Sequence, residues 1–261
     1  MAAAALKIAA AAGLALLAAL AAAQRVPRYE PPRTANGKPD LQGIWQARST
    51  AGTDLEHHSG SFGMPAGFGV VVDPPDGKIP YQAAALAQRA RNFAARTTAD
   101  PLAKCYLAGV PRTMYLDDPL QILQTADELV ILSEYVHTFR WIPFAGPPRY
   151  EGYESWMGDS RAHWDGDTLV VETVGFNADT WLDRAGNFHS DALRVVERFT
   201  RTDAATITYE ATLDDPKVFT RPWTIRMPLV RNPDRDRLLE NECYLYAEDA
   251  GQPIVGQHPE P

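Results

Sequence analysis

Apolar and polar residues alternate along most of the chain from residue 120 onward. In the run that begins at Leu193, the odd positions hold Leu193, Val195 and Phe199, whereas the even positions include two arginines. An alternation of period two predicts strands with one buried face, because successive side chains of a strand point to opposite faces. This texture predicts about eight or nine strands, within residues 40–46, 120–129, 129–142, 163–174, 193–202, 206–213, 221–231 and 237–246.

Short turns join these strands. Asp165-Gly166 is a strong hairpin signal, since an Asp-Gly pair adopts the positive φ angles that a two-residue hairpin turn needs. Residues 202–205 connect two further strands. Many strands joined by short turns, with little helix between them, predict a mainly β fold, an antiparallel up-and-down barrel, with a two-sheet sandwich as the alternative.

The part of the chain before residue 120 has a different pattern of apolar and polar residues. Residues 48–80 are rich in Gly, Pro, His and Ser without periodicity, which predicts a long loop. Residues 81–96 are rich in alanine and carry apolar residues at helical spacing, so they predict one helix. Residues 105–118 again predict a loop. We therefore expect a single barrel domain over residues 40–261, with a loop and helix insertion at about residues 48–118.

Residues 1–23 have the pattern of a cleavable signal peptide. Lys7 precedes a run of Ala and Leu, and the run ends in Ala21-Ala22-Ala23, the small-x-small pattern that signal peptidases accept. A transmembrane helix needs about 20 apolar residues with flanking charges, and this run is shorter. We expect cleavage before Gln24, an extended leader over residues 24–39, and no membrane anchor in the exported chain. The protein is thus expected to be periplasmic or extracellular.

The charge of the chain narrows the choice of partners. The sequence holds 33 acidic and 25 basic residues, which gives a formal net charge of −8. An acidic surface repels phosphate backbones and anionic lipids, so nucleic acid is not an expected partner. The count of apolar residues is ample for a core. Composition and charge leave the oligomeric state open.

The two cysteines, Cys105 and Cys243, are 138 positions apart. In an oxidising compartment such a pair is most simply one disulfide bond, and two buried free thiols are the alternative. Neither cysteine lies in a pattern typical of a catalytic thiol.

Several motifs resemble those of known proteins. Gly43-Ile44-Trp45 has the Gly-x-Trp form that opens lipocalin barrels, in which the tryptophan plugs one end. From residue 40 to the C-terminus the chain also resembles a large group of exported bacterial proteins. What this resemblance implies is a lipocalin-like or calycin-like barrel, and not a reaction. It rests on the segments 39–45, 134–140, 164–173, 180–183, 189–190, 197–198, 214–216 and 242–243.

The run 129–142, taken as one strand, offers two sets of candidate residues. If the odd positions point inward, Tyr135 and His137 lie in the cavity, with His137 as a general base or ligand donor. If the even positions point inward, Glu134 and Arg140 form a candidate buried ion pair. Either set could instead satisfy only internal hydrogen bonds.

Further candidates come from the later strands and their connection. Glu197 lies on the apolar face of its strand, where a carboxylate needs a partner or shifts its pKa upward, and a structural arginine is the simplest partner. The polar connection at residues 176–191 carries Trp181, Asp183 and His189. We expect His137, Asp183, His189 and Glu197 to converge at one mouth of the barrel as catalytic residues, because clustering would let buried polar groups satisfy one another.

The ligand-binding residues expected beside that cluster are Tyr135 and Trp181, as an apolar wall, with Glu134 and Arg140. No metal is expected, because the His and Asp spacing matches no metal motif, and no motif for a cofactor is found.

Three functions fit these expectations. The first is a cofactor-independent acid/base enzyme, of the isomerase, lyase or hydratase type, acting on a small, largely apolar or aromatic substrate. The second is a carrier of such a ligand without catalysis, which an entirely apolar cavity would favour. The third is an envelope interaction module, which a filled barrel would favour.

Overall fold

The computed structural model describes residues 29–148, 152 and 154–244. The predicted signal peptide, most of the leader up to residue 28 and the last 17 residues lie outside the described part. The chain divides into two units, residues 1–30 and residues 31–261. Only residues 29 and 30 of the first unit are described, so everything below concerns the second unit.

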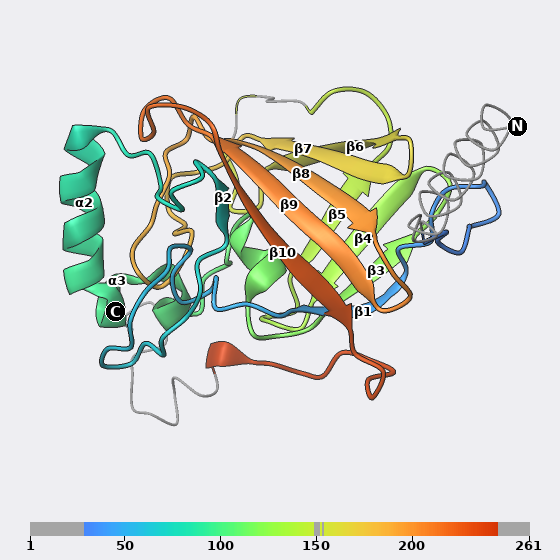
Figure 1. Cartoon of the computed structure of the whole chain (residues 1–261), viewed down its shortest axis with the longest axis horizontal. Helices are drawn as coiled ribbons and strands as arrows, with labels where there is room; N and C mark the ends of the chain where they lie inside the picture. Colours follow the sequence, from blue (N-terminus) through green and yellow to red (C-terminus); the bar gives the residue numbers. More distant parts are fainter. Residues whose placement is uncertain (1–28, 149–151, 153, 245–261) are drawn as a thin grey trace, which may run out of the picture. The chain divides into compact units, whose positions relative to one another are not determined.

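The second unit is a mainly β fold whose strands form a nearly closed antiparallel barrel (Figure 1). The hydrogen-bonded order is β5-β4-β3-β1-β10-β9-β8-β7-β6, and the short β2 pairs with β10 outside this path. The strands are β1 Gly43–Ala47, β2 Val71–Asp73, β3 Leu120–Gln124, β4 Glu128–Ser133, β5 Phe139–Pro143, β6 Asp159–Asp165, β7 Thr168–Val174, β8 Arg194–Arg201, β9 Thr206–Asp214 and β10 Trp223–Arg231. This confirms the predicted up-and-down barrel and rules out the sandwich.

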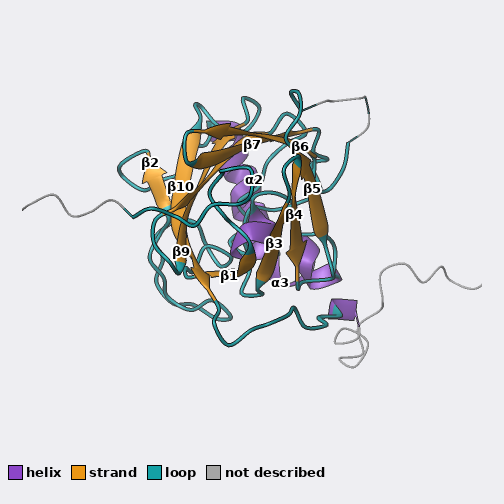
Figure 2. Cartoon of the chain, turned by 90° about the vertical axis from the view of Figure 1, so that its right-hand side faces the viewer, coloured by secondary structure: helices purple, strands orange, loops and turns teal. Residues whose placement is uncertain are grey.

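The first and last strands of the barrel pair with each other, so its open seam falls in the middle of the sequence. β1 pairs with β10, and the two ends of the hydrogen-bonded path are β5 and β6, which lie side by side (Figure 2). Nine strands cannot all alternate in direction around a ring. The register makes β5 and β6 the one pair of neighbours that run the same way, and no ladder joins these two strands.

The two ends of the barrel differ in their connections. At one end the turns are short, at residues 125–127, 166–167 and 202–205. The other end, which we call the loop end, carries the long connections 48–119, 175–193 and 215–222 and the helix α2, drawn at the left of Figure 1. Loops of this length on a rigid sheet scaffold are where binding residues gather.

The insertion before β3 holds the helices of the fold. The predicted helix is confirmed as α2, Ala83–Ala94, and it is followed by α3, Arg96–Ala99. Two short 3₁₀ helices, η1 Pro101–Lys104 and η2 Arg112–Tyr115, follow in segments read partly as loop from the sequence. All four residues of η2 are buried at the loop end of the barrel.

The prediction of one strand over residues 129–142 is wrong. The chain makes two strands, β4 and β5, around a turn in which Val136 and His137 have φ of 45° and 51°. Consecutive residues with positive φ give the primed turn that suits a hairpin. Valine rarely adopts such angles, and Val-His is not among the residue pairs typical of two-residue hairpin turns, so the sequence carried no clear turn signal. Because the turn intervenes, the buried positions are odd in β4 (Ile131) and even in β5 (Arg140).

The strand predicted over residues 237–246 is also not formed in its described part, residues 237–244. These residues instead run along the loop end, where Asn241 forms a single bridge with Tyr135. The predicted disulfide is present there. Cys105 and Cys243 are joined, with 5.5 Å between their Cα atoms.

The barrel interior is filled by side chains. Trp45 is fully buried, its indole N–H donates to the carbonyl of Leu41 over 2.9 Å, and the guanidinium of Arg231 lies 4.7 Å from its ring. Trp45 is thus fixed inside the barrel by a hydrogen bond and by a cation–π contact. Trp223, Tyr209 and a set of aliphatic residues of the other strands are equally buried. Most buried apolar side chains form one cluster inside the barrel, and a smaller cluster contains Ala108, Leu116 and Tyr135.

Candidate functional site

An ion pair lies in the middle of this core. Arg140 of β5 donates to Glu197 of β8 through two bonds, of 3.1 and 2.6 Å, and both side chains are almost inaccessible to solvent. Tyr209 donates its hydroxyl to the same carboxylate over 2.9 Å. Arg140 also donates to Ser160 and Thr173, at 3.2 and 3.4 Å. The carboxylate of Glu197 is thus held by three donors inside the core.

Arg140 therefore reaches from β5 across the seam to β6, β7 and β8. At this place the backbone ladder is missing, and the side chain supplies the polar links between the two edges. The expected Glu134–Arg140 pair is wrong. Glu134 lies in the turn after β4, where it accepts from Arg235 over 3.0 Å and from the backbone N–H of Leu239 over 2.8 Å.

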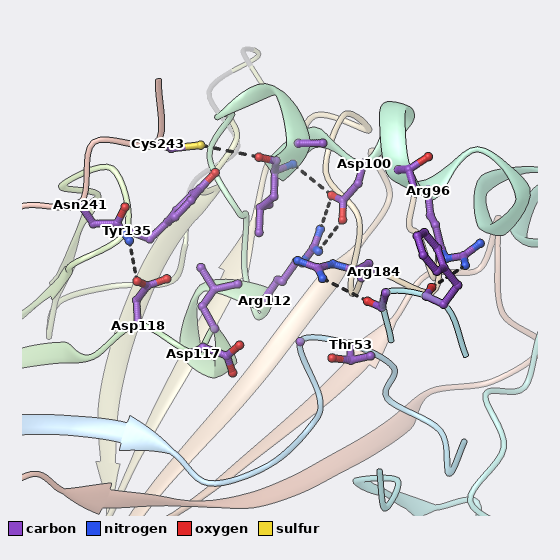
Figure 3. A pocket seen from close by; sticks show the side chains of 17 residues that line it. Thr53, Arg96, Asp100, Arg112, Asp117, Asp118, Tyr135, Arg184, Asn241 and Cys243 are labelled. Atoms are coloured by element: carbon purple, nitrogen blue, oxygen red, sulfur yellow. Dashed lines mark hydrogen bonds and ion pairs between the residues drawn. The ribbon is translucent and has the colours of Figure 1, made fainter. Parts of the chain in front are cut away.

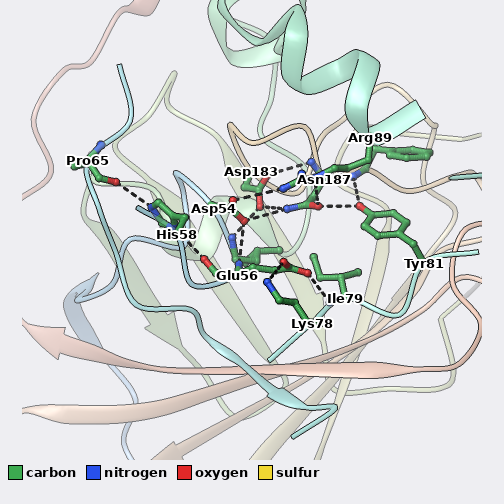
Figure 4. A network of polar contacts seen from close by, with 12 residues as sticks. Asp54, Glu56, His58, Pro65, Lys78, Ile79, Tyr81, Arg89, Asp183 and Asn187 are labelled. Atoms are coloured by element: carbon green, nitrogen blue, oxygen red, sulfur yellow. Dashed lines mark hydrogen bonds and ion pairs between the residues drawn. The ribbon is translucent and has the colours of Figure 1, made fainter. Parts of the chain in front are cut away.

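Asp183 is fully buried in a second polar network, which joins the loop after residue 50 to the connection between β7 and β8 (Figure 4). Its carboxylate accepts from the backbone of Leu55 over 2.9 Å and from Asn187, whose side chain lies at 2.5 Å. Asn187 also contacts Asp54, and Arg89 pairs with Asp54 over 3.5 Å. The network fixes two long loops to each other.

Burial raises the pKa of Asp183 to about 7, and the negative charge of Asp54 raises it in the same direction. The donors from Asn187 and Leu55 oppose this shift, because they stabilise the ionised form. Burial also raises the pKa of Asp54. Since Asp183 has no access to solvent, its titration affects the stability of the loops and gives no proton to a substrate.

His189 and His137 have separate surroundings. His189 is buried, with Nδ1 at 2.8 Å from the carbonyl of Ser190 and Nε2 at 2.5 Å from the hydroxyl of Thr180. Burial lowers its pKa, which keeps the ring neutral with Nδ1 as the donor. His137 lies in the exposed turn, half accessible, and Nδ1 is 3.0 Å from Glu242.

The four expected catalytic residues thus take part in four different sets of contacts. No hydrogen bond or ion pair joins any two of them among the described residues. Trp181 lies on the connection between β7 and β8 and lines a pocket, and Tyr135 lines another. The expected convergence of His137, Asp183, His189 and Glu197 is therefore not what the contacts show, because each group finds its partners locally.

The candidate site is a cavity of about 520 Å³ at the loop end (Figure 3). It lies between the insertion, the turn after β4 and the C-terminal segment. Its floor includes Arg112, which forms a buried pair with Asp100 through bonds of 2.7 and 2.8 Å. This volume is within the range of about 300–1,000 Å³ that is typical of small-molecule sites. The polar side chains that line it are Thr53, Arg96, Thr97, Asp100, Arg112, Asp117, Asp118, Tyr135, Arg184 and Asn241.

Charges of opposite sign stand on opposite sides of this cavity. Figure 3 shows Asp117 and Asp118 on one side and Arg96 and Arg184 on the other. Arg184 and Arg96 donate only to backbone carbonyls among the described residues, Arg184 to Gly63 and Arg96 to Phe62 and Phe93. Both guanidinium groups therefore remain available to an anionic group of a ligand.

Two groups that line the cavity, Asp118 and Tyr135, have raised pKa values. Burial raises the pKa of Asp118, and the charges of Glu134 and Asp117 raise it further, against a hydrogen bond from Asn241. Burial likewise raises the pKa of Tyr135 to about 12. Its hydroxyl donates to the carbonyl of Tyr106 over 3.1 Å. Asp118 is only half-buried, so a ligand in this cavity can reach its carboxyl group.

The C-terminal segment, residues 232–244, forms one wall of the cavity through Asn241 and Cys243. Several contacts fix it. Val136 donates its backbone N–H to the carbonyl of Asn241 over 3.2 Å, and the side chain of Asn241 donates to Asp118 over 2.6 Å. The disulfide bond to Cys105 holds its far end. The wall thus depends on a covalent link and on the hairpin turn that sequence reasoning missed.

Sequence reasoning missed most residues of this cavity. Arg112, Asp118 and Arg184 lie in segments without periodicity, and Asn241 lies in a segment read as a strand. Only Tyr135 and Cys243 were singled out. A possible signal was the density of charged residues in the connections at the loop end, but nothing in the sequence indicated which of them share a cavity.

Among the described residues, no group of three or more His, Cys, Asp or Glu side chains could hold a metal ion. Within the same residues no helix has the length and apolarity needed to cross a membrane. The chain matches no protein-family model and no curated protein. The fold and the cavity together define a lipocalin-like barrel with a filled interior and a polar pocket at its loop end.

Proposed function

We propose that the protein binds a small polar organic molecule in the cavity at the loop end of the barrel. The observation that carries this proposal is the separation of charge across the cavity, with Arg96 and Arg184 facing Asp117 and Asp118. A ligand that carries a carboxylate at one end and an amine or hydroxyl donor at the other complements both sides.

The filled interior supports this location. Fully buried side chains and the Arg140–Glu197 pair occupy the place where a lipocalin-like carrier would hold an apolar ligand. A small apolar or aromatic ligand, expected from the sequence, finds few matching surfaces in a cavity lined by charged groups. A filled barrel also fits an interaction module, but a formed cavity with unpaired arginines favours small-molecule binding.

Acid/base catalysis is the second candidate function, and Asp118 favours it. Its raised pKa and its partial exposure within the cavity are the properties of a general acid or base. In this form the enzyme would be an isomerase, lyase or hydratase without a cofactor. Asp118 would exchange the proton, and Arg184 would orient the carboxylate of the substrate.

We also propose that the protein is exported to the periplasm or beyond the cell. The Cys105–Cys243 bond supports this, because disulfide bonds persist in oxidising compartments and are rare in the cytosol. The pattern of residues 1–23 supports it from the sequence.

Calorimetric titration with a matched set of probes tests the binding function. The probes are 4-aminobutyrate, butyrate, butylamine and indole. We expect 4-aminobutyrate to bind more tightly than either singly charged analogue, and Arg184→Ala and Asp118→Asn each to weaken it by about 10- to 100-fold, as expected for a charged hydrogen bond. Arg194→Ala, which removes an exposed arginine of β8 outside the cavity, is the matched control.

Two outcomes contradict the proposal. One is tighter binding of indole than of 4-aminobutyrate. The other is binding of 4-aminobutyrate that Arg184→Ala leaves unchanged.

A further inference from the structure

A second pocket, of about 490 Å³, lies on the other side of η1 from the first. The segment from α3 through η1 is a shared wall: Asp100, Leu102 and Ala103 line the first cavity, whereas Ala99, Pro101 and Lys104 line the second. The remaining lining residues of the second pocket are Tyr106, Trp156, Ala178, Asp179 and Trp181. Nothing in the proposed function uses this pocket.

The polar groups of this second pocket lack hydrogen-bond and ion-pair partners among the residues that the structure describes. Among the described residues no hydrogen bond or ion pair engages the Lys104 ammonium, the Tyr106 hydroxyl, the Asp179 carboxylate or the indole N–H groups of Trp156 and Trp181. In the first cavity, by contrast, Asp100 is paired with Arg112, and Asp118 with Asn241. Within the described part of the chain, the second pocket thus offers donors and an acceptor that solvent or a ligand can satisfy.

Three aromatic side chains line the same pocket as these polar groups. The rings of Tyr106 and Trp156 are 5.1 Å apart and tilted by 60°, and Trp181 lines the same pocket. All three side chains are half-buried. An aromatic face is apolar and carries negative quadrupole charge, so it packs well against polarised C–H groups.

The charges of the pocket limit the ligand further. Lys104 and Asp179 have opposite signs, and no other charged residue lines the pocket among those that the structure describes. The pocket therefore has no net charge to attract an ion, but it presents hydrogen-bond donors on four side chains and an acceptor on Asp179. The complementary ligand is neutral, has many hydroxyl groups and exposes flat C–H faces.

From these features we propose that the second pocket binds a carbohydrate, with a pyranose ring packed against Trp181 or Trp156 and its hydroxyl groups bonded to Lys104 and Asp179. A pyranose ring has C–H faces and equatorial hydroxyl groups. The C–H faces match the aromatic side chains of the pocket, and the hydroxyl groups match its polar side chains. The site is independent of the first cavity, because the two share only the η1 wall.

Titration of the full mature protein with neutral oligosaccharides tests this proposal. The probes are maltotetraose, cellotetraose and chitotetraose, followed by intrinsic tryptophan fluorescence and calorimetry. We expect saturable binding of at least one of them, a loss of about tenfold or more in Trp181→Ala, and a smaller loss in Trp181→Phe, which keeps an aromatic face. Trp141→Ala, which removes an exposed indole on β5, should leave binding unchanged.

Asp179→Asn serves as a second variant that leaves the aromatic residues intact, so that the test does not depend on the folding of Trp181→Ala. Binding of a tetrasaccharide should persist in Arg184→Ala, which separates this site from the proposed function of the first cavity. Three results would overturn the proposal: none of the three probes binds, binding survives both Trp181→Ala and Asp179→Asn, or choline binds with the same dependence on Trp181 while the sugars do not.

Discussion

Arg140 on β5 and Glu197 on β8 meet inside the barrel through two hydrogen bonds, at 3.1 and 2.6 Å, across the seam that no backbone ladder closes. The two residues are 57 positions apart in the sequence. Arg140 reaches Ser160 on β6 and Thr173 on β7 as well. The ion pair therefore links both edges of the sheet as well as filling the core, and we infer a structural role for it.

Breaking this pair should destabilise the fold strongly. Glu197→Gln leaves the guanidinium of Arg140 buried without a counter-charge, which costs about 3–5 kcal/mol of unfolding free energy. Denaturant unfolding measures the change. The double variant Arg140→Met with Glu197→Leu should recover much of the loss, because no charge is then left unpaired. Arg194→Ala, which breaks an exposed pair with Glu172, is the control and should cost less than about 1 kcal/mol. A change below that limit in Glu197→Gln would contradict the structural role.

Stability should fall as the pH rises from about 4 to about 7. The pKa of Asp183 is near 3.8 in an unfolded chain and is raised to about 7 in the folded protein. Between these values the folded protein holds a proton that the unfolded chain has lost, so raising the pH favours unfolding. Urea unfolding at pH 5 and pH 7.5 measures the difference, which should be on the order of a few kcal/mol.

Asp183→Asn isolates this contribution. The amide does not titrate, so the variant should lose the difference between pH 5 and pH 7.5 even though it is less stable at both. Its lower stability has a separate cause, since an amide offers one acceptor oxygen where the carboxylate accepts from Leu55 and Asn187. If Asp183→Asn kept the full difference in unfolding free energy between pH 5 and pH 7.5, the pH dependence would come from other groups.

Removing the disulfide should loosen the first cavity more than the barrel. Cys105→Ser with Cys243→Ser opens a loop of 138 residues, for which the chain-entropy model gives a loss of about 5 kcal/mol. Because Asn241 and Cys243 form a wall of the cavity, we also expect weaker binding of 4-aminobutyrate at temperatures where the variant is fully folded. In this double variant, hydrogen exchange should show lower protection of the backbone amides in residues 232–244 than in β8 and β9. If residues 232–244 were as well protected in the double serine variant as in the unchanged protein, the cavity wall would not depend on the disulfide.

The exported protein should begin near Gln24. Signal peptidase would cut after Ala23, within the small-x-small pattern that closes the apolar run. N-terminal sequencing of protein recovered from the periplasm or medium measures this directly. Exported material that starts at Met1 would show that the segment is not removed.

The sequence by itself determined the class of fold and much of its local structure. Period-two alternation, the Asp165-Gly166 turn and the alanine-rich run at 81–96 are local signals, and each produced the expected strand, hairpin or helix. The inward position of Glu197 and the pairing of Cys105 with Cys243 were also predicted, the first from the apolar face of its strand and the second from the count of two cysteines and the expected export.

Apart from the disulfide, only the tertiary structure decided which distant residues meet. The turn at Val136 and His137 has no local signal, since its positive φ angles are held by contacts such as the bond from Val136 to Asn241, more than 100 positions away. That turn reverses which face of the strand points inward, and so gives Glu197 its partner. The first cavity likewise combines residues from the insertion, the β7–β8 connection and the C-terminal segment, and the second pocket combines residues from the insertion, the β5–β6 connection and the β7–β8 connection. Periodicity describes one element at a time, whereas the partner of a buried charge depends on how distant elements pack together.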